Sequence, residues 1–324
     1  MMLLKASLLL PLCAAAAIET YDYIVVGSGP GGGPLAANLA RAGHSTLLLE
    51  AGSDQGSNPN ITQLSNLLYV RNDPKIAWDF FVRHSNDPKR QANYNELVWL
   101  QTDGQYYTGL NPPAGAKQLG IWYPRAGTLG GCATHNAAAA LLPANSDWNY
   151  ISSITGDKSW QAANMRTYFE KLEKNLYLPK GTPGHGFNGY LNVSQDNSTW
   201  ATVNSDAREI GLLAAQAIDP KITAGQLQSA LQKDINALDP NRDTKESIYG
   251  FAVHASKGVR ATPIDYIRAT LADAARFPLT VKTNSLVTKV LFDVSANHGP
   301  KGPRATGVEV LQGESLYAAD RRSN

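Results

Sequence analysis

The residues best suited to chemistry form a glycine-rich turn near the N-terminus. Gly27, Gly29 and Gly32 are spaced as G-x-G-x-x-G and follow an apolar run. The first glycine of such a turn permits the bend, the second lets backbone N–H groups approach a pyrophosphate, and the third lets a helix pack closely on a strand. The candidate phosphate-binding residues are therefore Gly27, Ser28, Gly29, Pro30 and Gly32.

A carboxylate follows this turn at the expected distance. Glu50 ends the next apolar run, and an acid at this place in a dinucleotide-binding fold accepts hydrogen bonds from ribose hydroxyls. Its charge would repel a 2′-phosphate, which argues against NADP. A solvated carboxylate at the end of a strand is the simpler alternative, and the turn by itself does not separate FAD from NAD.

A second glycine-rich segment reads Pro-Arg-Ala-Gly-Thr-Leu-Gly-Gly-Cys-Ala-Thr-His-Asn from Pro124 to Asn136. Together with the first turn it resembles the glucose–methanol–choline family of flavoprotein oxidoreductases, whose first signature has Leu-Gly-Gly-Ser-Ser, two further residues and Asn. Cys132 and Ala133 depart from the hydroxyl residues of the family, and Ala137 departs from its glycine. The resemblance implies FAD, with flavin contacts from Gly130, Gly131, Cys132, His135, Asn136, Ala137 and Ala139. Simple turn chemistry is the alternative for the glycine pair.

His135 is the most informative residue of this segment. In the choline-oxidase-like and pyranose-oxidase-like branches, a histidine just before the Asn or Trp is bonded to the flavin 8α-methyl group. Cys132 to Asn136 looks like the choline oxidase version, so the resemblance points to covalent FAD through His135. A bonded imidazole would make the flavin a better hydride acceptor. An ordinary packed histidine remains the alternative.

The elements that must hold these residues form a βαβ unit. Residues 21–26 and 46–49 predict strands, and the helical spacing of apolar residues between them predicts a helix that stops at Gly43. The resemblance also places the Val287 backbone, in a later predicted strand, beside the adenine. A core strand without ligand contact is the alternative for Val287.

The later chain shows helical and strand patterns that are simpler to interpret. Helices are predicted over 160–174, 204–218 and 224–238, with Ile210, Leu213 and Ala214 in the core. Thr262, Pro263 and Asp265 predict a helix start, as N-cap, first position and first-turn acid, with the helix reaching Phe277. Strands are expected over 279–283, 286–294 and 305–311.

The expected fold class is α/β, with α+β in the second domain: a Rossmann-like FAD-binding domain with an inserted substrate domain. Residues 18–151 and 246–324 are expected to form the discontinuous, incomplete FAD-binding domain, and 152–245 part of the substrate-binding domain. The resemblance ends before the family's second signature and its catalytic histidine segment. We therefore expect an N-terminal fragment that lacks the C-terminal part of the fold and the catalytic base, and no catalytic residue is assigned. The other histidines are expected at the surface or in packing: His44, His84, His185, His254 and His298.

Composition limits the partners. The 324 residues are 43% hydrophobic and 17% charged, which excludes disorder, and the net charge of +2 is spread without basic blocks, which argues against nucleic acid. Residues 1–17 resemble a signal peptide, whose apolar run is too short to span a membrane. Sequons at Asn60, Asn192 and Asn197 agree with a secreted glycoprotein. No metal site is expected.

The expected reaction is oxidation of the CH–OH group of an alcohol or sugar by hydride transfer to flavin N5, with oxygen or a quinone as electron acceptor. Two alternatives remain open. One is a catalytically inactive flavin-binding or lyase-type relative on the same fold. The other is an NAD-dependent dehydrogenase, against which the flavin-like segment from Leu129 to Asn136 argues.

Overall fold

The predicted βαβ unit is present in the computed structural model, which describes residues 19–293 and 302–323. β1 (Tyr23–Val26) and β2 (Thr46–Leu49) pair in parallel, and α1 (Gly32–Arg41) connects them. β14 (Leu279–Lys282) pairs in parallel with the other edge of β2 and completes the order β1-β2-β14. The predicted signal peptide, the last residue of the 286–294 strand and His298 lie outside the described residues.

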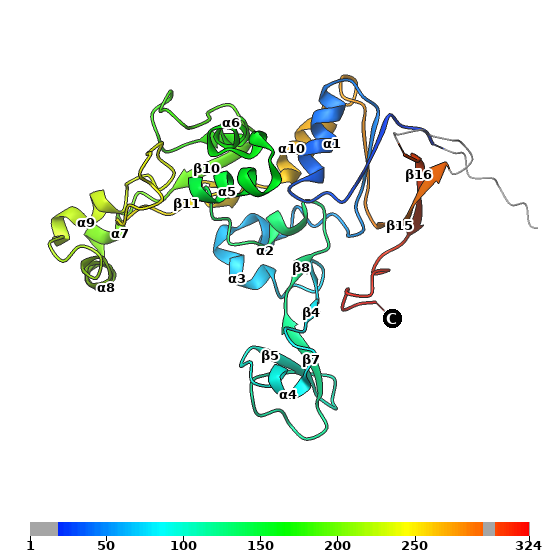
Figure 1. The fold of residues 1–324 in the computed structure, drawn as a ribbon, viewed down its shortest axis with the longest axis horizontal. Helices are drawn as coiled ribbons and strands as arrows, with labels where there is room; N and C mark the ends of the chain where they lie inside the picture. The colour runs from blue at the N-terminus through cyan, green and yellow to red at the C-terminus, as the bar shows by residue number, and fades with distance from the viewer. Residues whose placement is uncertain (1–18, 294–301, 324) are drawn as a thin grey trace, which may run out of the picture.

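Two helices cover one face of this sheet. α1 and α10 (Pro263–Leu271) lie side by side (Figure 1) and bury small and branched residues against the strands. The predicted start of α10 is confirmed: Thr262 and Asp265 form a capping box around Pro263. Because these helices and strands share one apolar core, they hold the glycine turn between β1 and α1 rigidly. The core residues are Val25, Ala36, Ala40, Leu48, Leu129, Ile264, Ile267, Phe277 and Leu279.

A second lobe follows in the chain. It contains a three-stranded sheet of order β11-β10-β9, and helices α5 (Asn145–Thr155) and α6 (Ala162–Leu172) lie beside it in Figure 1. Three helices form its far end: α7 (Trp200–Val203), α8 (Ser205–Gln216) and α9 (Ala224–Ala230). The strands of the sheet are β9 (Glu173–Asn175), β10 (Leu191–Gln195) and β11 (Ala252–Val253).

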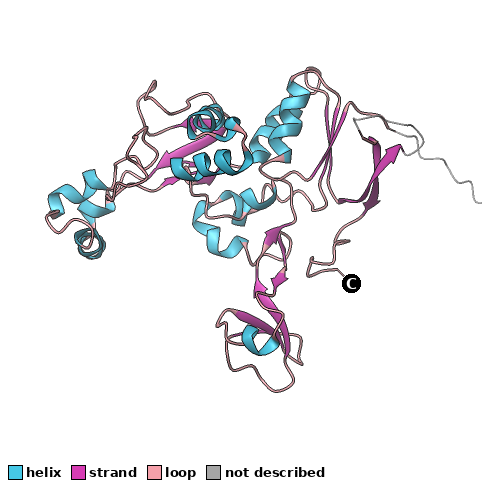
Figure 2. Ribbon diagram, in the orientation of Figure 1, coloured by secondary structure: helices cyan, strands magenta, loops and turns pink. Residues whose placement is uncertain are grey.

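A β-rich arm projects from the body (Figure 2). Its four-stranded sheet has the order β4-β7-β5-β6 and carries α4 (Pro88–Gln91). The strands are β4 (Phe81–Val82), β5 (Leu97–Leu100), β6 (Tyr106–Thr108) and β7 (Lys117–Trp122). At its base β3 (Ala77–Trp78) pairs with β8 (Arg125–Ala126), directly before the second glycine-rich segment.

Two β-hairpins and several short helices complete the described structure. β12 (Ala255–Ser256) pairs with β13 (Val259–Arg260), and β15 (Ser285–Asp293) with β16 (Arg304–Gln312). The short helices are α2 (Pro59–Thr62), η1 (Leu64–Asn66), α3 (Leu67–Val70), η2 (Gly131–Thr134) and η3 (Lys158–Trp160). Among the described helices, none has the length and apolar character needed to cross a membrane.

Four predicted helices end earlier than expected, among them the 204–218 helix, which stops at Gln216. The 160–174 helix stops at Leu172, because the chain then enters β9. The 224–238 helix stops at Ala230, and the Asp234 carboxylate instead accepts the backbone N–H of Asn236, a local bond that competes with helix. α10 stops at Leu271 rather than Phe277, and residues 272–276 form turns. Pro278 disfavours helical backbone only at Phe277 itself.

The predicted core face of α8 is also wrong. Ile210 and Leu213 are 70% and 63% exposed, and Ala214 is exposed too. The helix instead buries Ala215 against α7 and α9 in a small satellite core. Helical periodicity identified an apolar face of α8. Which side of the helix packs against a neighbour depends on tertiary contacts that the sequence of one helix does not encode.

The domain bounds 18–151, 152–245 and 246–324 stay a prediction. β14, from the last part of the chain, pairs in parallel with β2 from the first part. The two parts are separated in sequence by the lobe that contains α5 to α9.

Candidate cofactor-binding site

The glycines of the first turn differ in whether the fold itself requires them. Gly27 has φ +88°, which favours glycine, and its N–H donates to the Leu49 carbonyl at 2.7 Å. A Cβ on Gly32 would lie 2.0 Å from the Gly27 oxygen, so the fold itself requires glycine there. A Cβ on Gly29 would meet only the Gly131 Cα, at an ordinary 3.9 Å. No group of the described protein therefore demands glycine at position 29.

Glu50 is tied to this turn. It is 6% exposed, and one carboxylate oxygen accepts from the Ser28 N–H at 3.0 Å and from the Ser28 hydroxyl at 2.5 Å. The other oxygen accepts from the Gly52 N–H at 2.9 Å. A carboxylate offers about four acceptor positions, so these three donors leave room for a further hydroxyl.

The two glycine-rich segments meet. The Gly130 N–H donates to the Ser28 hydroxyl oxygen at 3.0 Å, which links the second segment through Ser28 to Glu50. Gly130 and Gly131 have φ +90° and +54°. A Cβ on Gly131 would lie 2.6 Å from the Gly29 Cα, so the two backbones touch where any side chain would separate them. Segments about a hundred residues apart in the chain thus form one continuous backbone surface.

His135 follows η2 and is largely buried. Its Nε2 atom is buried and has no hydrogen-bond partner among the described residues. Burial, and next the positive charges of Arg260 and Arg125, lower the pKa of His135 to about 4. The imidazole is therefore neutral at neutral pH. A neutral ring with an unpartnered nitrogen is available to a ligand.

Asn136 has a defined orientation. Its side-chain oxygen accepts from the Ala138 N–H at 2.9 Å and from Arg260 Nη1 at 3.0 Å. The same guanidinium nitrogen donates to the Asn136 backbone oxygen at 2.8 Å. Asn136 is exposed, and its Nδ2 atom donates to no protein acceptor within the described structure.

The remaining predicted residues lie around this surface to different degrees. Pro30 and Ala137 are exposed, Cys132 is a free thiol of intermediate exposure, and Ala139 bridges to Val253 of β11. Val287 pairs with Val310 in the β15–β16 hairpin. Its link to the site is indirect: the N–H of Ser285, two residues earlier, donates to the Glu50 carbonyl at 2.9 Å.

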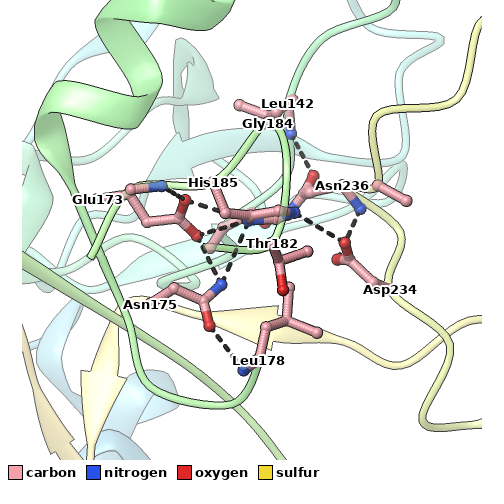
Figure 3. Close-up of polar contacts among 12 residues, drawn as sticks. Leu142, Glu173, Asn175, Leu178, Thr182, Gly184, His185, Asp234 and Asn236 are labelled. Carbon is pink, nitrogen blue, oxygen red and sulfur yellow. Dashed lines mark hydrogen bonds and ion pairs between the residues drawn. The ribbon is translucent and has the colours of Figure 1, made fainter. Parts of the chain in front are cut away.

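Sequence reasoning missed a second polar cluster, in the lobe of β9 and β10 (Figure 3). His185 is 8% exposed and contacts Glu173 through Nδ1 at 3.2 Å and Asp234 through Nε2 at 2.9 Å. Burial opposes its protonation, but the hydrogen bonds to Asp234 and Glu173 outweigh burial and raise the pKa of His185 to about 9. No sequence motif joins these residues, which are 12 and 49 positions from His185.

Figure 3 shows that the cluster is closed by neutral partners: Asn175 donates to Glu173, and the Asp234 carboxylate accepts from Asn236. In addition, Tyr177 donates to Asp234 at 2.8 Å. Such a saturated network is typical of a structural contact. The expectation that His185 serves packing is thus consistent with its surroundings.

The other described histidines differ from both. His44 is exposed and lies edge-on to Tyr23, and His84 is exposed with its Nε2 atom 3.1 Å from the Tyr123 hydroxyl. His254 is partly buried, with an unpartnered Nδ1 among the described residues. A search of that same part of the chain finds no group of three or more metal-ligating side chains.

Comparison with curated proteins finds relatives along most of the chain, whereas no family model matches it. The chain is 28% identical to the oxidoreductase cicC of Emericella nidulans over 61% of its own length and 32% of that protein. It is 27% identical to an oxygen-dependent choline dehydrogenase of Photobacterium profundum, over 92% of its own length and 43% of that enzyme. The chain thus spans less than half the length of these relatives.

Comparison with solved structures supports the fold. Pyridoxine 4-oxidase from Mesorbium loti matches with a TM-score of 0.61 and 19% identity, over 90% of this chain and 46% of that one. The predicted α/β, Rossmann-like fold class is confirmed by this likeness.

Proposed function

We propose that this chain, a relative of the glucose–methanol–choline oxidoreductases, binds FAD across its two glycine-rich segments as part of an enzyme that oxidises alcohol or sugar CH–OH groups. One observation supports this most: the Gly130 N–H, the Ser28 hydroxyl and the Glu50 carboxylate form a single hydrogen-bonded chain, which joins the three predicted contact regions.

The described residues fit FAD. The side-chain-free Gly29 backbone would let a pyrophosphate approach, and α1 begins three residues later, at Gly32, with its partial positive charge. Glu50 retains acceptor capacity for a ribose hydroxyl. The loop from Gly130 to Ala139 would hold the flavin ring, and the unpartnered Nε2 of His135 belongs to that loop. Val287 beside the adenine remains a prediction.

When bound, FAD supplies the hydride acceptor for a carbinol carbon. This chain's own residues bind and orient the cofactor: the two backbone turns approach it without side chains between, and Asn136 offers an amide donor. No described residue is assigned as the proton acceptor. The alcohol or sugar substrate, and oxygen or a quinone as electron acceptor, both belong to the proposal.

Covalent attachment through His135 is part of the proposal. Its ring nitrogen would bond to the flavin 8α-methyl carbon, the imidazole N–H and one methyl C–H would be lost as two protons, and the two electrons would pass to the flavin ring and from there to the oxygen or quinone acceptor. A nucleophilic imidazole must be uncharged, and the lowered pKa of His135 meets this requirement. The absence of a described partner for Nε2 leaves that nitrogen free to react.

Secretion is also proposed, from the signal-like residues 1–17. Of the three sequon asparagines, Asn197 is exposed and lies in a loop. Asn60 donates its amide to Asp73, and Asn192 lies within β10. We expect a glycan at Asn197 if the chain is exported.

The test of cofactor binding compares two glycine variants. Gly29→Ala should leave the fold unchanged, because its Cβ meets only an ordinary contact, yet weaken FAD binding by crowding the pyrophosphate. Gly32→Ala should damage the fold itself. Circular dichroism follows folding, and quenching of flavin fluorescence follows binding. A folded Gly29→Ala that binds FAD as tightly as the parent would contradict the assignment, and tight NADH binding by the parent would favour the dehydrogenase alternative.

A further inference from the structure

Arg260 is a buried cation with unusual surroundings. It lies in β13, outside both glycine-rich segments, and is 4% exposed. Its guanidinium donates to three oxygens, all on neutral groups: the Ile61 carbonyl, and the backbone and side-chain oxygens of Asn136. Among the described ion pairs it has no carboxylate partner, and its Nη2 atom is buried without an acceptor.

Burying the Arg260 charge without a counter-charge lowers the stability of the fold, so stability does not explain its placement. A buried charge without a counter-charge loses hydration that neutral acceptors replace only in part, and burial accordingly lowers the pKa of Arg260. Two of its three bonds converge on one residue of the predicted flavin loop. The geometry therefore suggests a role in holding that loop.

Two hydrogen bonds to the Asn136 side-chain oxygen, one from Arg260 and one from Ala138, decide which way its amide faces. An asparagine amide has one acceptor end and one donor end. Arg260 Nη1 and the Ala138 N–H both donate to the acceptor end, at 3.0 and 2.9 Å, and either would be lost if the amide were reversed. The donor end is left for a group outside the described protein.

We propose that Arg260 is the positioning residue of the flavin loop, which orients Asn136 so that its amide nitrogen donates to the bound flavin. This inference rests on the proposed FAD binding and adds a residue that the motifs do not contain. Arg260 acts through Asn136 and makes no contact with the flavin itself.

A second consequence of the same placement can be measured without cofactor. After burial, the charge of Arg260 is the next largest cause of the low pKa of His135, followed by Arg125. Removing that charge should raise the pKa of His135 in the free protein. NMR titration of the imidazole resonances reports this directly.

The experiment uses the 324-residue chain with four variants: Arg260→Gln, Arg260→Lys, Asn136→Asp and the double variant Arg260→Gln/Asn136→Asp. Asn136→Asp keeps an acceptor for Arg260 but removes the amide donor. Arg166→Gln is the matched control. Arg166 is partly buried and, like Arg260, donates to carbonyl oxygens, those of Gly184 and Asn236, but it lies in the second lobe. FAD dissociation constants come from flavin fluorescence, and circular dichroism checks folding.

We expect Arg260→Gln and Asn136→Asp each to weaken FAD binding about tenfold, the effect of one lost charge-assisted or amide hydrogen bond. The double variant should be no weaker than either single one. Arg260→Gln should also raise the pKa of His135, Arg260→Lys should keep it low, and Arg166→Gln should change neither quantity. If Arg260→Gln does not fold, Arg260→Lys and Asn136→Asp decide by the same measurements.

Equal FAD affinity in folded Arg260→Gln and the parent would overturn the inference, as would fully additive effects in the double variant. A parent chain that takes up no FAD would overturn the proposed function and this inference together. The two failures are therefore distinct.

Discussion

His135 and His185 occupy two regions of the molecule and have opposite electrostatic environments. Both imidazoles are largely shielded from solvent. His135 lies near two arginines with an unpartnered Nε2, and its pKa is lowered to about 4. His185 lies between two carboxylates with both ring nitrogens bonded, and its pKa is raised to about 9.

The difference distinguishes the proposed binding region from a structural one. In the cluster around His185 every charge has a partner, so the cluster stabilises the lobe as it stands. In the proposed flavin loop His135 Nε2 is unpaired, and Arg260 of β13, which donates to that loop, has an unpaired Nη2. Unpaired buried groups lower the stability of the chain by itself. The unpaired His135 Nε2 and Arg260 Nη2 therefore support the expectation of a ligand at this loop.

The largest expected effect concerns flavin attachment. In FAD-loaded protein, acid denaturation should leave the flavin in the protein pellet, because His135 would be bonded to its 8α-methyl group. His135→Ala should release all of it to the supernatant while non-covalent binding through Gly29 and Glu50 persists. Absorbance of the two fractions measures the outcome. Free FAD from the unmodified protein would reduce His135 to a neighbour of the ring.

Next in size is removal of the other imidazole. His185→Ala leaves Glu173 and Asp234 buried without their shared cation, and breaking a buried ion pair costs about 3–5 kcal/mol. Urea unfolding would measure the loss. His84→Ala, at an exposed histidine, is the control and should change the free energy of unfolding by less than about 0.5 kcal/mol. Equal losses of unfolding free energy in His185→Ala and His84→Ala would contradict a stabilising role for the His185 cluster.

The pH dependence of the His185 cluster should follow from its raised pKa. The folded state holds the proton more tightly than the unfolded state, whose histidine pKa is about 6.5. The stabilisation is fully present below about pH 6.5 and is lost as pH rises through about 9, by up to about 3 kcal/mol. Unfolding free energies at pH 6 and pH 10 test this, with His185→Ala as the variant that should lack the difference.

His135 should behave in the reverse sense and with the smallest effect. Its folded pKa lies below the unfolded value, so the unfolded state binds the proton first and stability falls as pH drops from about 6.5 towards 4. Because the ring is partly exposed, solvent screening reduces the effect to about 1 kcal/mol. His135→Gln should be more stable than the parent at pH 4.5 and similar at pH 7.5. No gain at pH 4.5 would argue against a buried neutral imidazole.

Local patterns determined much of the fold. The βαβ unit, the capping box at Thr262 and the strand of β14 were predicted correctly, because each depends on turn glycines, caps or apolar runs within a few residues. The resemblance to the glucose–methanol–choline oxidoreductases, read from two glycine segments, is likewise confirmed by the relatives. The roles of the individual site residues stay predictions.

Tertiary structure decided what local patterns do not contain. The exposed face of α8 depends on which neighbours pack against it, and the shortened α10 ends where the chain turns to bury Phe277. The charge of a histidine depends on residues far along the chain: Arg260 lies 125 positions from His135, and Asp234 lies 49 from His185. The sequence by itself predicted which residues bind a cofactor, and that prediction is still to be tested. The pairing of buried charges, which sets the protonation state of each imidazole, was decided only when the folded chain brought its partners together.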